Sequence, residues 1–579
     1  MPTADRQDRK PKAIAVVTDF PDPGTLREYG YLAMADSVRL AYVLYRRCDA
    51  LKYPAIVYYS AYANCATPYS EAKVYLDAGY AFLGANVRGS GASEGVYSYY
   101  QPIEAEDGLE LIDWIGRQPW CNGRVGMVGA SYGAHTQIKV AALNPAYLRA
   151  IVPVAVEGSE YRDEAVVGGM FNAGLMAEWT YKTQPERARA GIATRLAAGD
   201  QNCAGGQAEQ QRNRAYEQVL EHPLIDDWWH ARTLDEMAEK ITIPTLVIHA
   251  WQDEWMRPNG AIRLFNALRS SHKRLVLQNG PHRISRRDVN IKEQLRWLDR
   301  WVKGEENGVE AEPPVTILWE VARSPDGVSE RPGWVTRYLS WPPAAVKWKS
   351  LYLTRGGEMT EEAPSVSDDL SQRRYCYPLG TAMFGNTEQF ALEPSSIGSV
   401  KYRTQVTTSD IAILGSPEVT LYFSVTRSDV DFMFVLTDID FEGNELFLQR
   451  TVLRASLRAV DERASTDWEV VQSFERVDSL VPGEIYEVKL SLSAVGHVLR
   501  QGHRLALTVM APNTIPAPVW AFAPYPEASL ISIHHSGLHP SRIRLPIIVG
   551  ERAQASAPPP GALVNQPVRI SRESRAEPA

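Results

Sequence analysis

The feature that most constrains this sequence is a serine between two glycines, placed where a strand-like segment meets a helix-like one. Residues 123–130 read GRVGMVGA, a short apolar run typical of a buried strand, and residues 132–143 read YGAHTQIKVAAL, which has helical character. Gly129 and Gly133 flank Ser131, where side chains would crowd a sharp turn. This context predicts that Ser131 is a nucleophile. The short Gly-x-Ser-x-Gly pattern alone would not predict it.

Apolar runs alternate with helix-like segments over the first part of the chain. The runs are short and continuous, and they end in polar or glycine-rich sequence, as expected for parallel strands buried on both faces. They cover residues 53–62, 80–89, 124–131, 149–158, 243–254 and 273–282. This pattern predicts an α/β fold whose active residues follow the strand ends.

Changes of pattern divide the chain into five parts. Residues 157–240 are helical in character, and we interpret them as a cap inserted between two parts of an α/β core, residues 1–156 and 241–345. Residues 346–552 show short alternating strand patterns separated by turns, which predict a jelly-roll β-sandwich. Residues 553–579, rich in Pro, Ser and charge, are expected to drape over the surface or to stay mobile.

Candidates for a base and an orienting acid follow Ser131 in the chain order acid before histidine. Asp253 and His282 each follow an apolar strand-like run. His249 lies inside such a run and His135 lies at the start of the helix after Ser131, so neither displaces His282. The alternatives are a helix cap for Asp253 and a plain loop position for His282.

A second group of histidines does not predict a metal site. His534, His535 and His539 have no spaced carboxylate or cysteine partners, so we interpret them as structural. Acyl transfer by a serine nucleophile needs neither a metal nor an organic cofactor. We therefore expect neither.

Charge and composition exclude other classes of function. The formal net charge of −8, without a cluster of Lys and Arg, argues against nucleic-acid binding. The polar amino terminus does not resemble a secretion signal, and no apolar run reaches the ~18 residues that cross a bilayer. The five scattered cysteines form no C-x-x-C pair. We expect a soluble cytoplasmic protein without nucleic-acid or membrane partners. The sequence leaves open whether it forms a homodimer.

The sequence resembles the α/β-hydrolase serine hydrolases that are grouped with cocaine esterase and the X-prolyl dipeptidyl peptidases. The resemblance covers nearly the whole chain. It is carried by segments 35–46, 85–95, 106–134, 251–255, 279–282, 502–509 and 534–546, among them EDGLELIDWIGRQPWCNGRVGMVGASYGA and HHSGLHPSRIRLP. It implies an α/β-hydrolase core, an inserted helical cap and a carboxy-terminal jelly roll that closes one side of the active site.

The resemblance also implies a role for each catalytic candidate. Ser131 would be the nucleophile and His282 the general base and then the acid, while Asp253 would fix the imidazole tautomer. One oxyanion donor would be the backbone N–H of Tyr132, directly after the nucleophile. The other would be a tyrosine hydroxyl at the end of an early strand, which matches Tyr62.

The tyrosine assignment has a competing interpretation. Tyr62 is preceded by Ala61, where the family usually has proline. Tyr58 or Tyr59 could serve as the donor instead.

Substrate recognition is the least determined part. Four acids in the first part of the cap lie near the expected pocket entrance: Glu157, Glu160, Asp163 and Glu164. They could hold a substrate ammonium, as X-prolyl peptidases and α-amino ester hydrolases do, or form a solvated polar face. Trp179 resembles the cap aromatic that lines the acyl site in cocaine-esterase-like members. Glu254 and Trp255 follow the triad acid, where α-amino ester hydrolases carry several acids.

Three functions remain open on the sequence. The first is hydrolysis of small-molecule carboxylic esters, with activated amides or lactones as further substrates. The second is release of X-Pro dipeptides or hydrolysis of α-amino acid esters. The third is a binding module that has lost catalysis, against which the intact order Ser131, Asp253, His282 argues strongly.

Overall fold

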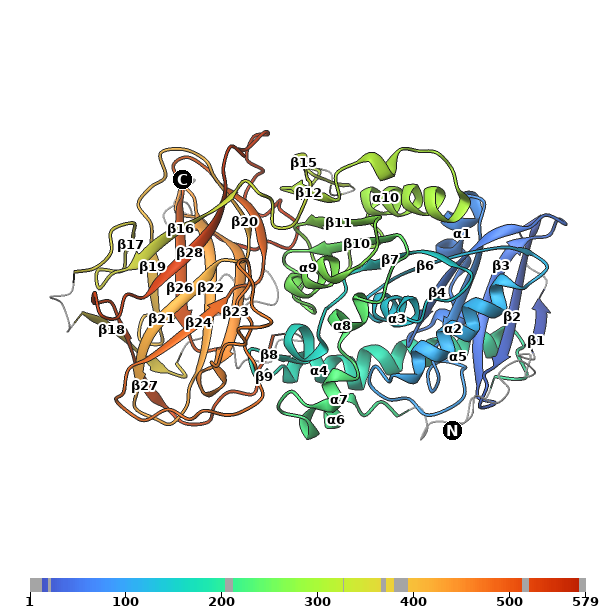
Figure 1. Cartoon of the computed structure of the whole chain (residues 1–579), viewed down its shortest axis with the longest axis horizontal. Helices are drawn as coiled ribbons and strands as arrows, with labels where there is room; N and C mark the ends of the chain where they lie inside the picture. Colours follow the sequence, from blue (N-terminus) through green and yellow to red (C-terminus); the bar gives the residue numbers. More distant parts are fainter. Residues whose placement is uncertain are drawn as a thin grey trace, which may run out of the picture.

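The computed structural model describes residues 13–18, 22–203, 212–325, 327, 329–365, 371–379, 394–512 and 520–571. Two lobes lie side by side, an α/β lobe formed by the first part of the chain and a β-sandwich lobe formed by the last part (Figure 1). The predicted fold class, an α/β-hydrolase core with a helical cap and a jelly-roll domain, is confirmed.

An eleven-stranded mixed sheet forms the centre of the α/β lobe, in the order β1-β2-β3-β5-β4-β6-β7-β10-β11-β12-β15. The strands from β5 to β12 in this order run parallel, and the strands at both edges are antiparallel. β5 and β10 are buried along their whole length, which explains their continuous apolar sequences. The strands are β1 (Ala13–Thr18), β2 (Thr25–Ala33), β3 (Arg39–Arg47), β4 (Tyr53–Ser60), β5 (Ala81–Asn86), β6 (Cys121–Ala130), β7 (Leu148–Val154), β10 (Thr245–Ala250), β11 (Lys273–Gln278), β12 (Val315–Trp319) and β15 (Trp334–Tyr338).

Helices pack on this sheet. The α-helices are α1 (Tyr69–Asp77), α2 (Ile103–Gly116), α3 (Tyr132–Ala141), α9 (Pro258–Ala267) and α10 (Asp288–Leu298), with shorter turns η1 (Asn64–Ala66), η4 (Asp299–Lys303) and η5 (Val309–Ala311). Gly108 lets α2 approach α3 closely, since a Cβ there would lie 2.2 Å from a methyl group of Val140. The helix after Ser131 is thereby held firmly against its neighbour.

The segment between β7 and β10 is mainly helical. Its elements are η2 (Tyr161–Ala165), β8 (Val166–Val167), β9 (Met170–Phe171), α4 (Ala173–Glu178), η3 (Trp179–Thr183), α5 (Gln184–Ala197), α6 (Ala215–Glu221), α7 (Asp227–His230) and α8 (Leu234–Ala238). The strand pair β8–β9 was not expected. It turns through Gly168 and Gly169, both with positive φ, and the carbonyl of Gly168 accepts a 2.9 Å hydrogen bond from the sandwich residue Arg454.

The β-sandwich lobe has a nine-stranded and a five-stranded sheet. The first contains β16 (Val346–Leu353), β17 (Met359–Thr360), β18 (Gln372–Tyr377), β20 (Ile411–Gly415), β21 (Glu418–Val425), β24 (Tyr486–Ser491), β25 (Val495–Leu499), β27 (Ser529–His534) and β28 (Arg542–Ile548). The second contains β19 (Ser399–Arg403), β22 (Asp431–Ile439), β23 (Glu445–Arg454), β26 (Arg504–Met510) and β29 (Val568–Arg569). The short turn η6 (Ala455–Leu457) follows β23, and β13 (Ala322–Arg323) pairs with β14 (Glu330–Arg331) in the other lobe.

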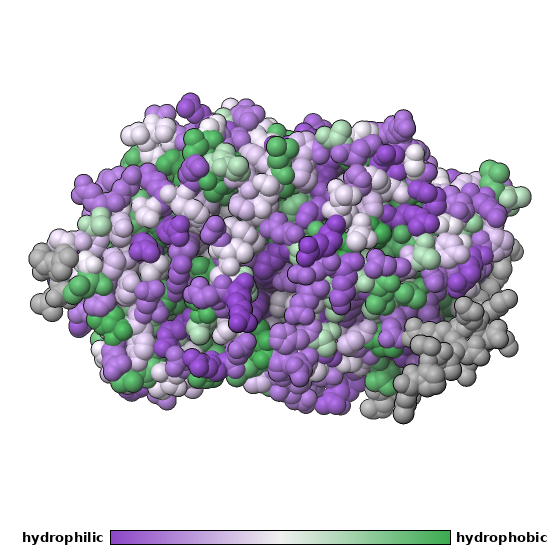
Figure 2. Space-filling view, viewed as in Figure 1, coloured by the Kyte–Doolittle hydropathy of each residue, from purple (hydrophilic) through white to green (hydrophobic). Residues whose placement is uncertain are grey.

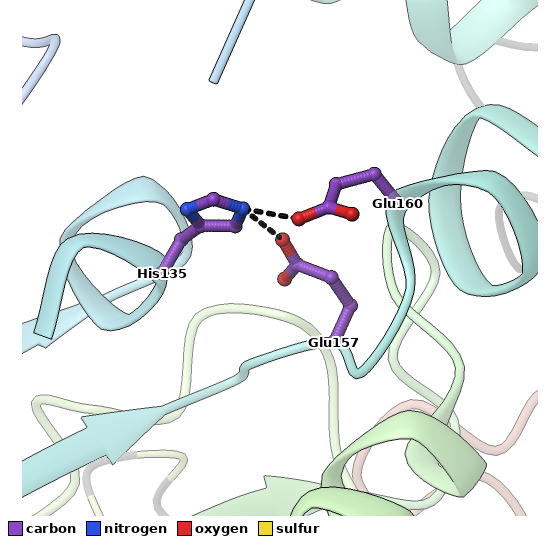
Figure 3. Close-up of side chains that lie close together, drawn as sticks. All are labelled: His135, Glu157 and Glu160. Atoms are coloured by element: carbon purple, nitrogen blue, oxygen red, sulfur yellow. Dashed lines mark hydrogen bonds and ion pairs between the residues drawn. The ribbon is translucent and has the colours of Figure 1, made fainter. Parts of the chain in front are cut away.

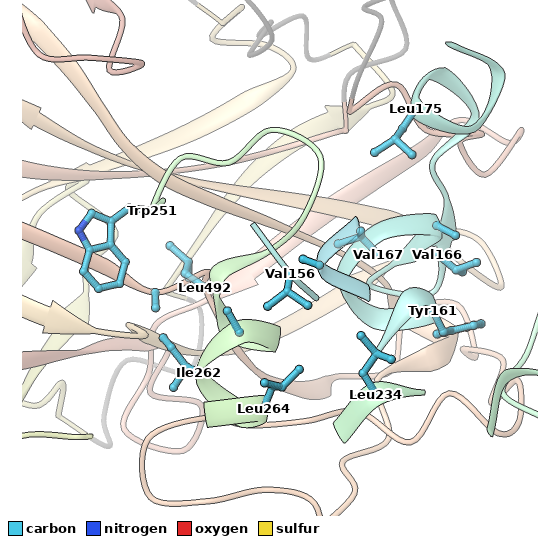
Figure 4. Packing of buried hydrophobic residues seen from close by; sticks show 14 of the residues in the cluster. Val156, Tyr161, Val166, Val167, Leu175, Leu234, Trp251, Ile262, Leu264 and Leu492 are labelled. Carbon is cyan, nitrogen blue, oxygen red and sulfur yellow. The ribbon is translucent and has the colours of Figure 1, made fainter. Parts of the chain in front are cut away.

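One apolar core runs from the α/β lobe into the sandwich. Figure 4 shows the sandwich residue Leu492 among buried residues of the other lobe such as Val156, Trp251 and Ile262. Polar contacts accompany this packing, since Gln449 donates a 2.6 Å hydrogen bond to the carbonyl of Trp251. The two lobes therefore share a core, unlike modules joined by a mobile tether.

The last segment that the structure describes, around Val564 and Val568, lies against both lobes. Val564 is buried and its N–H bonds to the carbonyl of Val321, while Val568 pairs with Leu446 of the sandwich. Hydrophilic residues predominate on the face seen in Figure 2, with apolar groups scattered among them. Within the described residues, no helix combines the length and the apolar character needed to cross a membrane.

Candidate active site

Ser131 occupies a strained turn between β6 and α3. Its φ of 58° is unusual for a residue with a side chain. The neighbouring glycines are required by the ring of Tyr58, because a Cβ at Gly129 would lie 2.7 Å from that ring and one at Gly133 only 2.3 Å away. The turn pushes the Ser131 side chain out of the sheet, as a nucleophile elbow does.

Asp253 and His282 meet at the carboxyl ends of β10 and β11. Nδ1 of His282 lies 2.9 Å and 3.1 Å from the two carboxylate oxygens of Asp253. Oδ1 of Asp253 also accepts backbone N–H groups of Trp255, at 2.8 Å, and Met256, at 2.9 Å. These bonds fix the carboxylate, which in turn fixes the imidazole with Nε2 free for a proton transfer.

The electrostatics of this pair favour the ionised forms. Burial would raise the pKa of Asp253, but His282 and the backbone N–H groups outweigh it and lower that pKa. Burial would lower the pKa of His282, but Asp253, followed by Glu254 and Glu164, outweighs it and raises that pKa above the ordinary value. An imidazolium formed during a reaction is therefore stabilised in place.

Tyr62 is the tyrosine that contacts Ser131. Its hydroxyl lies 3.3 Å from Oγ of Ser131 and accepts a hydrogen bond of the same length from the Trp179 indole. Tyr58 instead packs against the two glycines of the elbow, and the buried Tyr59 hydroxyl has no hydrogen-bond partner within the described part of the chain. Burial raises the pKa of Tyr62, so its hydroxyl keeps its proton and can donate.

The second expected oxyanion donor is the first residue of α3. Tyr132 begins this helix directly after Ser131, so its N–H has no acceptor within the helix. Its ring is buried and stacks on Trp179, with ring centres 6.2 Å apart. A backbone donor and the Tyr62 hydroxyl thus flank the same serine.

A pocket of about 490 Å³ opens over these residues. Ser131, Tyr62, His282 and Trp255 all line it. Among the described residues, no hydrogen bond joins Ser131 to His282, although both face this pocket. Such bonds often tighten only when substrate is bound.

Glu164 and Glu254 lie near His282 and are not among the residues that line the pocket. The Glu164 carboxylate accepts a 2.9 Å hydrogen bond from the Tyr99 hydroxyl, and burial raises its pKa to about 7. Glu254 accepts the backbone N–H of His282 at 2.9 Å. Both carboxylates are close enough to affect the pKa of His282.

The other cap acids lie elsewhere than at the pocket entrance. Glu157 and Glu160 are fully buried and face His135 on α3, and the pocket lining does not include them. Asp163 forms a 2.6 Å ion pair with Arg263. We expected these acids near the entrance because they come early in the cap. Position along the chain alone does not show which way the cap segment turns.

Arg187 is a site residue that the sequence analysis did not single out. It lines the pocket from α5, and its guanidinium carbon lies 4.7 Å from the centre of the Tyr62 ring. No local sequence pattern marks Arg187, because the contact joins the cap to a distant strand end.

The histidines of the last segment lie in the sandwich, where His534 bonds to Ser424 and His535 to Tyr402.

Comparisons with known proteins find relatives that cover most of the chain. Residues 36–283 match the model of the X-Pro dipeptidyl-peptidase (S15) family, and residues 307–519 match the X-Pro dipeptidyl-peptidase C-terminal non-catalytic domain. The chain is 26% identical to cocaine esterase of Rhodococcus sp., over 89% of this chain and 97% of that protein.

Two solved structures show the same fold. A CocE/NonD family hydrolase from Staphylococcus aureus superposes with a TM-score of 0.74 at 21% identity, over 93% of this chain and 97% of that one. An α-amino acid ester hydrolase superposes with a TM-score of 0.72 at 19% identity, over 94% of this chain and 100% of that one.

Proposed function

The chain belongs to the serine hydrolases related to cocaine esterase and the X-Pro dipeptidyl-peptidases, and from this premise we propose that it cleaves small-molecule carboxylic esters through an acyl-enzyme on Ser131. The observation that carries the proposal is the joint position of four groups. Ser131 sits in a strained elbow against the Tyr62 hydroxyl, while His282 lines the same pocket and is hydrogen-bonded to Asp253.

The reaction follows from what each group can do. His282 accepts the proton of Ser131 as Oγ attacks the ester carbonyl, and Asp253 stabilises the imidazolium that forms. The negative oxygen of the tetrahedral intermediate accepts hydrogen bonds from the Tyr62 hydroxyl and the Tyr132 N–H. The alcohol then leaves with the proton from His282. Water hydrolyses the acyl-enzyme by the same steps in reverse.

A fluorophosphonate probe and an ester panel test this proposal. We expect the probe to label Ser131 in the parent protein and not in Ser131→Ala, with loss of p-nitrophenyl ester hydrolysis in the variant. An unlabelled parent protein would favour the binding-module alternative. Esters of graded acyl length, together with activated amides and lactones, define the range of substrates.

A second candidate is supported by the carboxylates near His282. Glu164 and Glu254 lie close enough to raise the pKa of His282, and carboxylates near that histidine suit a substrate with a free α-ammonium group, such as an X-Pro dipeptide or an α-amino acid ester. Rates on a p-nitrophenyl ester, an α-amino acid ester and an Xaa-Pro anilide separate the two. A strong preference for the ammonium-bearing substrates, lost in Glu164→Gln, would favour the second.

The cytoplasmic location and a homodimer remain part of the proposal. Cell fractionation and light scattering after size-exclusion chromatography test them.

A further inference from the structure

A group of titratable side chains lies outside the catalytic machinery, between α3 and the segment that follows β7. His135 projects from α3, and Glu157 and Glu160 project toward it from the start of the cap segment (Figure 3). One ligand atom from each of the three lies within 4.8 Å of the others. Nε2 of His135 contacts Glu160 and lies 3.7 Å from Oε1 of Glu157.

These donors are buried and incompletely satisfied. All three side chains have no exposed surface. Among the residues that the structure describes, neither oxygen of Glu157 has a hydrogen-bond partner, and Oε2 of Glu160 lacks one as well. Unpaired buried carboxylate oxygens are costly, so a site of this kind calls for a bound cation or for protons.

The imidazole is held in a fixed orientation. The ring of Tyr100 stacks on His135 with centres 3.9 Å apart and planes 16° apart. Nε2 therefore stays directed at the two carboxylates. A preset donor geometry of this kind lowers the cost of binding an ion.

Other buried charged groups surround the cluster. The carboxylates of Glu157, Glu160 and Glu164 interact with one another, and Asp163 also acts on Glu157. Two cations face them, Lys139 and Arg232. Lys139 donates to the carbonyls of Tyr100 and Gln101, and Arg232 donates to those of Tyr99 and Trp228. Among the described residues, neither cation hydrogen-bonds to Glu157 or Glu160.

We propose that His135, Glu157 and Glu160 bind one divalent transition-metal ion, and that Zn²⁺ suits this site best. One imidazole nitrogen and two carboxylates form a mixed set that Zn²⁺ accepts, and a second oxygen of either carboxylate can complete four-coordination. The site is closed to solvent, which is typical of structural metals. Its ion would tie the helix that follows Ser131 to the first turn of the cap.

This proposal revises the expectation that the chain needs no metal, and it does not depend on the proposed hydrolytic function. Because the donors are buried, the ion would be acquired during folding. The test therefore measures metal content and thermal stability, which do not require an active enzyme.

The experiment compares the full-length protein with two buried-carboxylate variants, all produced in zinc-supplemented medium and dialysed. Glu157→Gln keeps the size of a donor and removes its charge, while Glu104→Gln changes a buried carboxylate outside the donor set. Mass spectrometry of first-row transition metals should find about one equivalent of zinc per chain in the parent and in Glu104→Gln. Glu157→Gln should retain less than about a tenth of that amount.

Unfolding provides the second readout. Melting of the parent in the presence of excess EDTA should begin several degrees lower than in ZnCl₂, and Glu157→Gln should show no such difference. If Glu157→Gln does not fold, the zinc content and melting temperature of Glu160→Gln and of the parent protein test the proposal instead. A parent protein with no transition metal, and a melting temperature that ZnCl₂ and EDTA leave unchanged, would overturn the proposal in favour of protonated carboxylates.

Discussion

The guanidinium carbon of Arg187 lies 4.7 Å from the centre of the Tyr62 ring, and the hydroxyl of that ring faces Ser131. The cap thereby places a positive charge on the side chain that is proposed to stabilise the oxyanion. Burial raises the pKa of Tyr62, and Arg187 acts in the opposite direction. A cation at this position strengthens the phenol as a hydrogen-bond donor.

Tyr62→Phe should keep the fold and lower kcat by about 10²–10³, the loss typical of removing one oxyanion donor. Steady-state kinetics with a p-nitrophenyl ester measure it. Tyr58→Phe is the matched control, because Tyr58 lines the same pocket and, among the described residues, its hydroxyl makes no hydrogen bond to Ser131. A Tyr62→Phe variant within about twofold of the parent would remove Tyr62 from the mechanism.

Arg187→Met should lower kcat by up to about tenfold, since a cation over an aromatic ring contributes about 0.5–2 kcal/mol. KM for a neutral ester should change much less. Arg189→Met alters an exposed arginine on the same helix and should have no effect. Equal losses in the two variants would mean that Arg187 acts only through helix stability.

The pH profile of kcat/KM should rise through a midpoint above about 6.5, because only a neutral His282 can accept the Ser131 proton and its pKa is raised. Glu254→Gln removes one of the carboxylates responsible and keeps an acceptor for the His282 N–H. The midpoint should then move to lower pH. The exposed Glu362→Gln is the control. An unchanged midpoint in Glu254→Gln would contradict this account.

The raised pKa of His282 also makes the free energy of unfolding depend on pH. A folded-state pKa above the unfolded value means that His282 contributes stability that is complete below the unfolded pKa. This contribution is lost as the pH rises through the folded pKa. Urea unfolding of Ser131→Ala and of Ser131→Ala/His282→Gln at several pH values would detect it.

Gly133→Ala should destabilise the elbow by about 1–3 kcal/mol and abolish labelling by a fluorophosphonate. The added Cβ would lie 2.3 Å from the Tyr58 ring, so the turn that carries Ser131 must move. Gly356→Ala is the control, since the nearest atom to its Cβ would be 3.6 Å away. A stable, fully labelled Gly133→Ala variant would contradict this prediction, because it would show that the Tyr58 ring can move to make room for the added Cβ.

The α/β fold and the chain order of the catalytic candidates can be predicted from the sequence because both follow local rules. Strands buried on both faces leave continuous apolar runs, and Asp253 and His282 come just after two of them. The positions of Glu157 and Arg187 depend on how the cap folds back. A contact between two distant segments leaves no periodic pattern in the sequence of either segment. Neither the buried cluster at His135 nor the cation over Tyr62 could therefore be predicted.

The last prediction concerns the sandwich, whose contacts reach the loop that carries the acid. Gln252 bonds to the carbonyl of Leu448 at 3.0 Å, next to the Gln449–Trp251 bond and one residue before Asp253. Arg263 forms a 2.8 Å ion pair with Glu469 of the sandwich.

A protein ending at residue 345 would lose these contacts and expose the shared core, so we expect it to be insoluble or inactive. Gln449→Ala in the full-length chain is the milder variant, and it should reduce kcat while leaving the protein folded. Solubility, circular dichroism and hydrolysis of a small soluble ester measure both. A soluble truncated protein with the parental rate would show that the sandwich is an accessory module, because the acid loop would then hold its geometry without it.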